Sequence, residues 1–84
     1  MQDKLYIKYI NIHGKTEHLP AGLGLRLIRR SLKLTMKEVS ILLGIHRNTL
    51  RNYEYGKTRI PMSVLMRIMK LYGVETTYIS FKPN

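Results

Sequence analysis

Within residues 46–59, HRNTLRNYEYGKTR, two of the three arginines and both asparagines are regularly spaced. Arg47 and Arg51 are four residues apart, as are Asn48 and Asn52, so in a helix these side chains form two adjacent rows on one face. A guanidinium group can pair with O6 and N7 of guanine, and a carboxamide with N6 and N7 of adenine. The segment therefore has the hydrogen-bonding groups that nucleotide bases require, provided that a helix turns them outward.

The composition favours a polyanionic partner. The chain has 84 residues, with 15 Lys and Arg against 5 Asp and Glu, and a formal net charge of +10. Such a balance indicates DNA, RNA or an anionic membrane surface as the partner. The length predicts a single small domain over 1–84 of modest stability, for which a second copy of the chain would bury further surface.

Several classes of protein are disfavoured by what the sequence lacks. Without cysteine, disulfides, thiolate catalysis and Cys-based zinc sites are all excluded. No apolar run approaches the roughly 20 residues of a membrane span, and the first residues, MQDKLYIKYINIHGK, do not resemble a secretory signal. We therefore expect a cytoplasmic protein.

The first 19 residues are expected to form an N-terminal β extension. Residues 4–12 are rich in Ile and Tyr and alternate loosely, which predicts a strand. Residues 13–15 indicate a turn, and residues 16–19 predict a short returning strand that Pro20 ends.

A helical core is expected over residues 20–74. The first helix is predicted from Pro20 to Leu32, although Gly22 and Gly24 weaken its first turn and leave open a later start. Its expected inward face consists of four apolar residues near helical spacing: Leu23, Leu27, Ile28 and Leu32.

The second helix has clear signals at both ends. Thr35 and Glu38 have the spacing of a capping box, in which each side chain accepts the backbone amide of the other. The helix is predicted to run to about Leu43 and to stop at Gly44 in the left-handed conformation. Its expected buried residues are Val39, Leu42 and Leu43.

Two more helices follow. The third is predicted from His46 to about Tyr55, with Leu50 and Tyr53 buried, and Gly56 stops it. The fourth is predicted from Pro61 to Tyr72 and is closed by Gly73. Its expected inward residues are Val64, Leu65, Ile68 and Leu71.

The tail, residues 75–84, alternates again. Residues 75–81 are predicted to form a strand, with a short fifth helix as the alternative. Such a strand needs a partner, either the N-terminal strand of the same chain or a strand of another copy. The terminal strands are therefore the candidate dimer surface.

Residues 25–74 resemble the Cro/Xre-type helix-turn-helix repressor family. The matching residues are Arg29, Leu34, Thr35, Glu38, Val39, Gly44, Ile45, Leu50, Glu54, Gly56, Pro61, Leu65, Ile68, Leu71, Gly73 and Val74. The resemblance implies a mainly α fold, a helix-turn-helix bundle of four or five helices, to which this chain adds short strands at both termini. Ser40 departs from the family, which usually has Ala there, but it is small enough for the contact between helices 2 and 3.

The resemblance assigns roles to the third helix. Since the early residues of this helix enter the major groove in the family, it implies base reading by Arg47, Asn48 and Asn52. Arg51 can read a base or bind a phosphate, and Thr49 can contact a thymine methyl group or a phosphate.

Contacts to the DNA backbone are expected on either side of that helix. Met36 and Lys37 lie at the start of helix 2, where free amides can bind a phosphate oxygen. The loop after helix 3 contacts the backbone in relatives, and its cations and hydroxyls suit phosphate. Its candidate residues are Tyr55, Lys57, Thr58 and Arg59.

Arg29 and Glu54 match a salt bridge that ties helix 1 to the end of helix 3 in related repressors. A structural pairing is therefore expected for Glu54 rather than a chemical role.

No enzyme chemistry is indicated. His13, His18 and His46 lack the spacing of a metal site, the acids are too scattered for paired-carboxylate catalysis, and no Gly-rich phosphate loop of the Walker type is present. We expect no catalytic residue, no metal and no cofactor.

The leading hypothesis is a sequence-specific repressor that binds double-stranded DNA as a homodimer, at an inverted-repeat operator. One alternative is an antitoxin that represses its own operon and also binds a toxin protein, since some antitoxins of the family carry strands beside the helices. Another is a protein-interaction or RNA-binding module on the same fold. Membrane-surface binding is disfavoured because the cations are spread over several elements.

Overall fold

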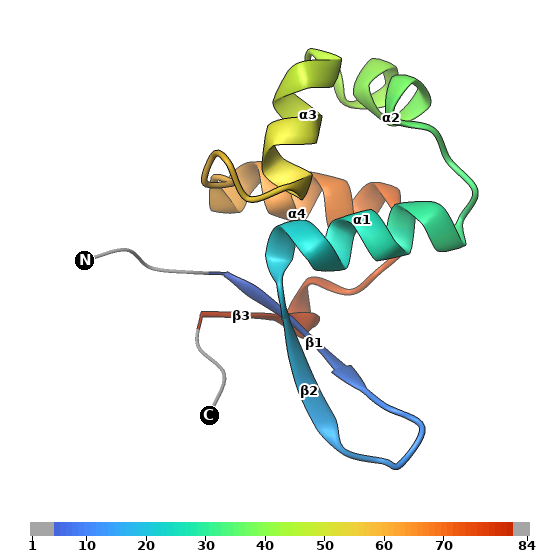
Figure 1. Cartoon of the computed structure of the whole chain (residues 1–84), viewed down its shortest axis with the longest axis vertical. Coiled ribbons are helices and arrows are strands. Elements are labelled where there is room, and N and C mark those ends of the chain that lie inside the picture. Colours follow the sequence, from blue (N-terminus) through green and yellow to red (C-terminus); the bar gives the residue numbers. More distant parts are fainter. Residues whose placement is uncertain (1–4, 82–84) are drawn as a thin grey trace.

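The computed structural model describes residues 5–81. Figure 1 shows the helices packed together on one side of a small β-sheet. The elements, in chain order, are β1 (Tyr6–Ile10), β2 (Thr16–Pro20), α1 (Ala21–Ser31), α2 (Met36–Leu43), α3 (Arg47–Glu54), α4 (Met62–Leu71), the 3₁₀ helix η1 (Thr76–Tyr78) and β3 (Ile79–Ser80). The mainly α fold with short strands near both termini is confirmed. Lys4, where the first strand was predicted to begin, and residues 82–84 of the predicted tail lie outside the described residues.

The hairpin β1–β2 forms where the alternating pattern predicted it, with a shorter first strand. The two strands pair antiparallel, with Ile7 opposite Leu19. The Asn11 side-chain oxygen accepts the backbone amides of His13 and Lys15, at 2.8 and 3.1 Å. These bonds satisfy the polar groups of the turn, which Figure 1 shows at the end of the molecule opposite α2 and α3.

The tail combines both structures that the sequence left open. A 3₁₀ turn comes first, and the two residues of β3 then pair antiparallel with β1, with Ile79 opposite Ile7. The sheet order is β2-β1-β3. The partner of the tail strand is therefore the N-terminal strand of the same chain, as Figure 1 also shows.

The hydrophobic core joins all four helices to the sheet. Its members are Ile7, Ala21, Leu25, Val39, Leu43, Leu50, Ile60, Leu65, Ile68, Met69 and Tyr72. Four predicted core residues are instead exposed at the surface: Leu27 (46%), Leu32 (45%), Leu42 (62%) and Leu71 (38%). In α4, Met69 is buried in the core.

The predicted inward face of α1 was partly wrong, for a tertiary reason: Ile28 packs half-buried against the core, but Leu27 and Leu32 do not. The helix buries Ala21, Gly24, Leu25 and Arg29. Arg29 is buried because its charge is paired inside the molecule, and Gly24 is buried because the Ile7 side chain lies against it. The prediction used only the spacing of apolar residues, so it could not include an arginine or a glycine in the inward face.

The glycines of α1 allow close packing rather than delaying the helix, which begins at Ala21. A Cβ atom at Gly22 would lie 2.2 Å from the backbone oxygen of Tyr53, and one at Gly24 would lie 2.8 Å from Cδ1 of Ile7. Because only a residue without a side chain fits at the first site, α1 can approach the end of α3 closely.

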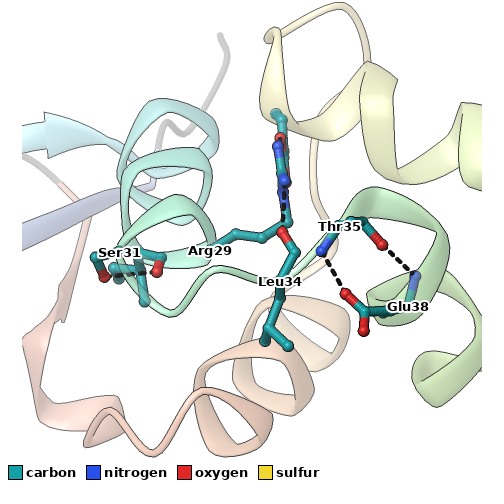
Figure 2. Close-up of polar contacts among 7 residues, drawn as sticks. Arg29, Ser31, Leu34, Thr35 and Glu38 are labelled. Carbon is teal, nitrogen blue, oxygen red and sulfur yellow. Dashed lines mark hydrogen bonds and ion pairs between the residues drawn. The ribbon is translucent and has the colours of Figure 1, made fainter.

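The capping box of α2 is confirmed. The Thr35 amide donates to the Glu38 carboxylate at 2.8 Å, and the Glu38 amide donates to the Thr35 hydroxyl at 3.1 Å (Figure 2). The bond from the Thr35 amide to the carboxylate, and secondly the Thr35 side chain, hold the pKa of Glu38 below its ordinary value. At the other end, Gly44 is left-handed with φ +70°.

A buried ion pair connects α1 to α3. The Glu54 carboxylate accepts bonds from Nε and Nη2 of Arg29, at 2.7 and 3.0 Å, and the Glu54 side chain is fully buried. Nη1 of Arg29 also donates to the carbonyl of Leu34 at 2.9 Å (Figure 2). The hydrogen bond to Glu54 is the main reason that the pKa of Arg29 is raised. The salt bridge expected from the sequence is thus present, and it also anchors the loop that leads into α2.

Tyr72 lies near this pair and should make stability depend on alkaline pH. Its hydroxyl is buried without a partner among the described residues. Burial, aided by the charge of Glu54, raises the pKa of Tyr72 to about 12. An unfolded tyrosine ionises near pH 10, so below that pH the group gives no pH dependence. From about pH 10 to 12 the unfolded chain loses the proton first, and about 2–3 kcal/mol of stability disappears.

The variant Tyr72→Phe is the matched control, and it should lack this alkaline loss. At neutral pH it should be as stable as the wild type or more so, by up to about 1 kcal/mol, because an unpaired buried hydroxyl is removed. Urea unfolding of both proteins at pH 8 and pH 11 measures the difference. The same loss of stability in both proteins would contradict the assignment.

Candidate nucleic-acid interface

The orientation of α3 is fixed from its buried side. Leu50 is fully buried, Tyr53 packs half-buried against the core, and Glu54 is held by Arg29. These three residues lie on one side of the helix, so the opposite side must face solvent. The predicted third helix is confirmed, and it is one residue shorter at each end than predicted.

His46 begins α3 in a way that the sequence did not indicate. Its Nδ1 atom accepts the backbone amide of Asn48 at 3.0 Å, so the imidazole serves as the N-cap. A histidine is an unusual cap, since Ser, Thr, Asp and Asn are the preferred residues. The sequence predicted His46 as the first residue of this helix, whereas the structure makes it the exposed cap that precedes Arg47.

The turn between α2 and α3 is held by backbone and side-chain bonds. The Ile45 amide donates to the carbonyl of Ser40 at 3.1 Å. Ser40 is buried, as expected for the small residue at the contact between the two helices. From α4, Arg67 donates to the carbonyl of Leu43 at 2.7 Å and so satisfies the end of α2. This role of Arg67 was not predicted, since its partner lies 24 residues away in the sequence.

The outward side of α3 carries most of the residues expected to read bases. Arg47, Asn48 and Arg51 are exposed, whereas Thr49 and Asn52 are half-buried. The carbonyl of Asn52 accepts the amides of Lys57 and Thr58, at 2.9 and 3.3 Å. Asn52 is therefore less open to a partner than its place in the outward row suggested, and it anchors the following loop.

The residues expected at the DNA backbone lie on both sides of this row. Lys57, Thr58 and Arg59 are all exposed, in a loop that folds back on the end of α3. Lys37 is exposed at the start of α2, but the Met36 side chain packs against the core. Met36 thus offers a partner its amide rather than its side chain.

Tyr55, the last residue expected at the backbone, is engaged with an arginine of α1. The guanidinium carbon of Arg26 lies 4.5 Å from the centroid of the Tyr55 ring, within the range of a cation–π contact. Arg26 beside the hydroxyl, and then the charges of Arg30 and Arg51, lower the pKa of Tyr55. Arg26 and Arg30 were missed because they were seen only as polar residues between the leucines of α1.

The acids of the described chain are all engaged elsewhere. Glu17 accepts a bond from Asn11, Glu38 belongs to the capping box, Glu54 holds Arg29, and Glu75 bonds to Thr77. Between residues 5 and 81, the pair Arg29–Glu54 is the only salt bridge. The exposed cations of α3 and its neighbours therefore remain available to an external anion.

Two short helices joined by a left-handed glycine turn, the second with its cationic and amide side chains outward, define a helix-turn-helix unit. A sequence model described as Helix-turn-helix matches residues 25–79, more than half of the chain. The chain belongs to the Cro/Xre-type helix-turn-helix family, and it is a DNA-binding regulator. The match begins within α1 and leaves out the hairpin β1–β2.

The other comparisons returned nothing, since no curated protein and no solved structure matched the chain. Every helix within residues 5–81 is too short or too polar to cross a membrane. Among those residues there is also no group of three or more His, Cys, Asp and Glu side chains that could hold a metal ion.

Proposed function

We propose that the protein is a transcriptional repressor that binds an inverted-repeat operator as a homodimer, with α3 of each copy in the major groove. The observation that carries the proposal is the exposed set Arg47, Asn48 and Arg51 on a helix whose opposite side is locked in the core. A rigid helix presents its donors in one geometry, and such a geometry is needed to distinguish base pairs.

In this proposal Arg47 and Asn48 read bases, since they lie in the first turn of α3, which enters the groove in docked helix-turn-helix proteins. Arg47 pairs with guanine and Asn48 with adenine. Asn52 reaches a base from a half-buried position, and Thr49 contacts a thymine methyl group or a phosphate. Arg51, one turn further on, takes a base or a phosphate.

Phosphate contacts fix the position of the helix in the groove. Lys57, Thr58 and Arg59 supply them from the loop after α3, and the amides of Met36 and Lys37 supply them from the start of α2. The loop contacts and the α2 contacts flank the reading helix, so they hold it from both sides of the groove.

The dimensions of one copy are compatible with a dimer on one face of DNA. Half-sites recognised by dimers of this kind are about one helical turn, ~34 Å, apart. The longest axes of the chain measure 35 and 33 Å. Two copies side by side can therefore place their α3 helices at this spacing.

Selection of bound duplexes from a random pool tests the proposal, because it returns the preferred site, its symmetry and its half-site spacing together. We expect an inverted repeat with half-sites about one turn apart. A pool that shows no enriched sequence would refute sequence-specific binding.

Two variants distinguish base recognition from phosphate contact, when their binding to the selected site is measured in competition. Arg47→Ala should cost about 1–3 kcal/mol and relax the preference at one base pair of each half-site. Lys57→Ala should weaken the binding of all sequences alike and reduce the salt dependence. If Arg47→Ala leaves the base preference intact, the role assigned to Arg47 is wrong.

A further inference from the structure

The basic surface of α3 continues across the helix junction onto α1. Arg47, Arg51 and Tyr55 follow one another at intervals of four residues, so they lie along one side of α3 and its C-cap. The Arg26 guanidinium stacks on the Tyr55 ring at 4.5 Å. Arg30, four residues after Arg26, lies one turn further along α1 and is exposed.

The Tyr55 hydroxyl lies in a positive environment. Arg26, which lies over the Tyr55 ring, is the main reason that the pKa of this hydroxyl is lowered, and the charges of Arg30 and Arg51 contribute less. No carboxylate of the described residues pairs with any of these three arginines, since Glu54, the acid nearest in sequence, is committed to Arg29. Positive charges on neighbouring turns of α1 and α3 that have no counter-charge attract an anion.

The stacking of Arg26 gives the cluster a defined geometry. A guanidinium held over an aromatic ring still has N–H donors directed away from the ring, and two such donors fit two oxygens of a phosphate. Because the ring already restricts the long side chain, less conformational entropy is lost when the anion binds.

We propose that Arg26, Arg30 and the Tyr55 hydroxyl bind a backbone phosphate of the DNA duplex whose bases α3 reads. The site lies at the C-terminal end of α3, away from the first turn that carries Arg47 and Asn48, so it contacts the sugar–phosphate backbone rather than base edges. The inference rests on the proposed function, since α3 must lie on DNA for the duplex to reach the junction. It adds α1 to the surfaces that hold the protein on its site.

The salt dependence of binding measures such contacts directly. On B-DNA the slope of log K against log salt is about −0.9 for each phosphate contact. Because the two arginines share one phosphate, removing both should make the slope shallower by about 0.9 for every bound copy of the chain, and Arg26→Gln and Arg30→Gln alone should each give part of that change. Neither variant should change the selected sequence, because a phosphate contact carries no base preference.

Lys15→Gln is the matched control. It also removes one positive charge, but from the exposed hairpin turn at the end of the molecule opposite α2 and α3 (Figure 1). Its slope should equal that of the wild type. Melting curves of all the variants establish that each is folded, and Arg30→Gln, at an exposed helix position, tests the site even if Arg26→Gln is unstable.

The outcomes separate this inference from the proposed function. If the wild type selects a site but both arginine variants keep the slope of Lys15→Gln, the phosphate site is refuted and the proposed function stands. If the pool shows no preferred sequence, the slopes are measured on random duplex, where phosphate contacts still count. Shallower salt slopes for the arginine variants than for Lys15→Gln on random duplex would support the phosphate site, even though the proposal of sequence-specific binding would be refuted. A wild type that binds no duplex at all overturns both.

Discussion

Replacing Glu54 with glutamine should lower the free energy of unfolding by about 3–5 kcal/mol, because it leaves a buried guanidinium without its counter-charge. The Glu54 side chain has no exposed surface, and it accepts two bonds from Arg29 at 2.7 and 3.0 Å. The amide of glutamine can keep one acceptor but not the negative charge. For a small domain, whose total stability is about 5–15 kcal/mol, such a loss leaves a marginal protein.

Urea unfolding followed by circular dichroism measures the effect. Glu17→Gln is the control, because it removes the same charge from an exposed position where the carboxylate bonds only to Asn11. Its cost should be below about 1 kcal/mol. The double variant Arg29→Met with Glu54→Leu should recover much of the stability, since it leaves no buried charge. Equal losses in the two Gln variants would mean that the ion pair does not hold α1 to α3.

Replacing Gly22 with alanine should be as damaging, for a steric reason. The new Cβ atom would lie 2.2 Å from the backbone oxygen of Tyr53 and 3.0 Å from that of Glu54. Backbone atoms cannot rotate away, so α1 and α3 must separate. The gain of about 1 kcal/mol from the better helix former is small beside this, and we expect a net loss of about 3 kcal/mol, at the upper end of overpacking costs.

Gly24→Ala tests the same explanation two residues away. There the nearest atom is Cδ1 of Ile7 at 2.8 Å, the flexible end of a side chain that can turn. We expect a cost of at most about 1 kcal/mol after the gain in helix propensity. Thermal unfolding of both variants gives the comparison. A Gly22→Ala protein as stable as Gly24→Ala would show that the two helices are not packed as described.

The sequence predicted best those features that a few neighbouring residues decide. The start of α2 depends on Thr35 and Glu38 alone, and its end depends on Gly44. The sequence therefore predicted both ends of α2 to within one residue. The outward row of α3 follows from a spacing of four residues and from one buried Leu50. In these cases the hydrogen bonds and packing are local, and the pattern contains all of the information.

Features that join distant segments were predicted poorly. The inward face of α1 was partly wrong because it is set by Arg29, whose partner lies 25 residues away. The tail remained ambiguous because a strand of two residues has too short a pattern to distinguish it from a turn. The stacking of Arg26 on Tyr55 involves two helices, and no spacing within either helix indicates it.

The pairing of β3 with β1 has a consequence for the order in which the chain folds. Ile79 lies beside Ile7, so on the ribosome the sheet stays incomplete until all four helices have been synthesised. Until then, the backbone hydrogen-bonding groups on one edge of β1 have no strand partner. Contacts between such distant segments form slowly. We therefore expect the turns within each helix to form early and the sheet to close late in folding.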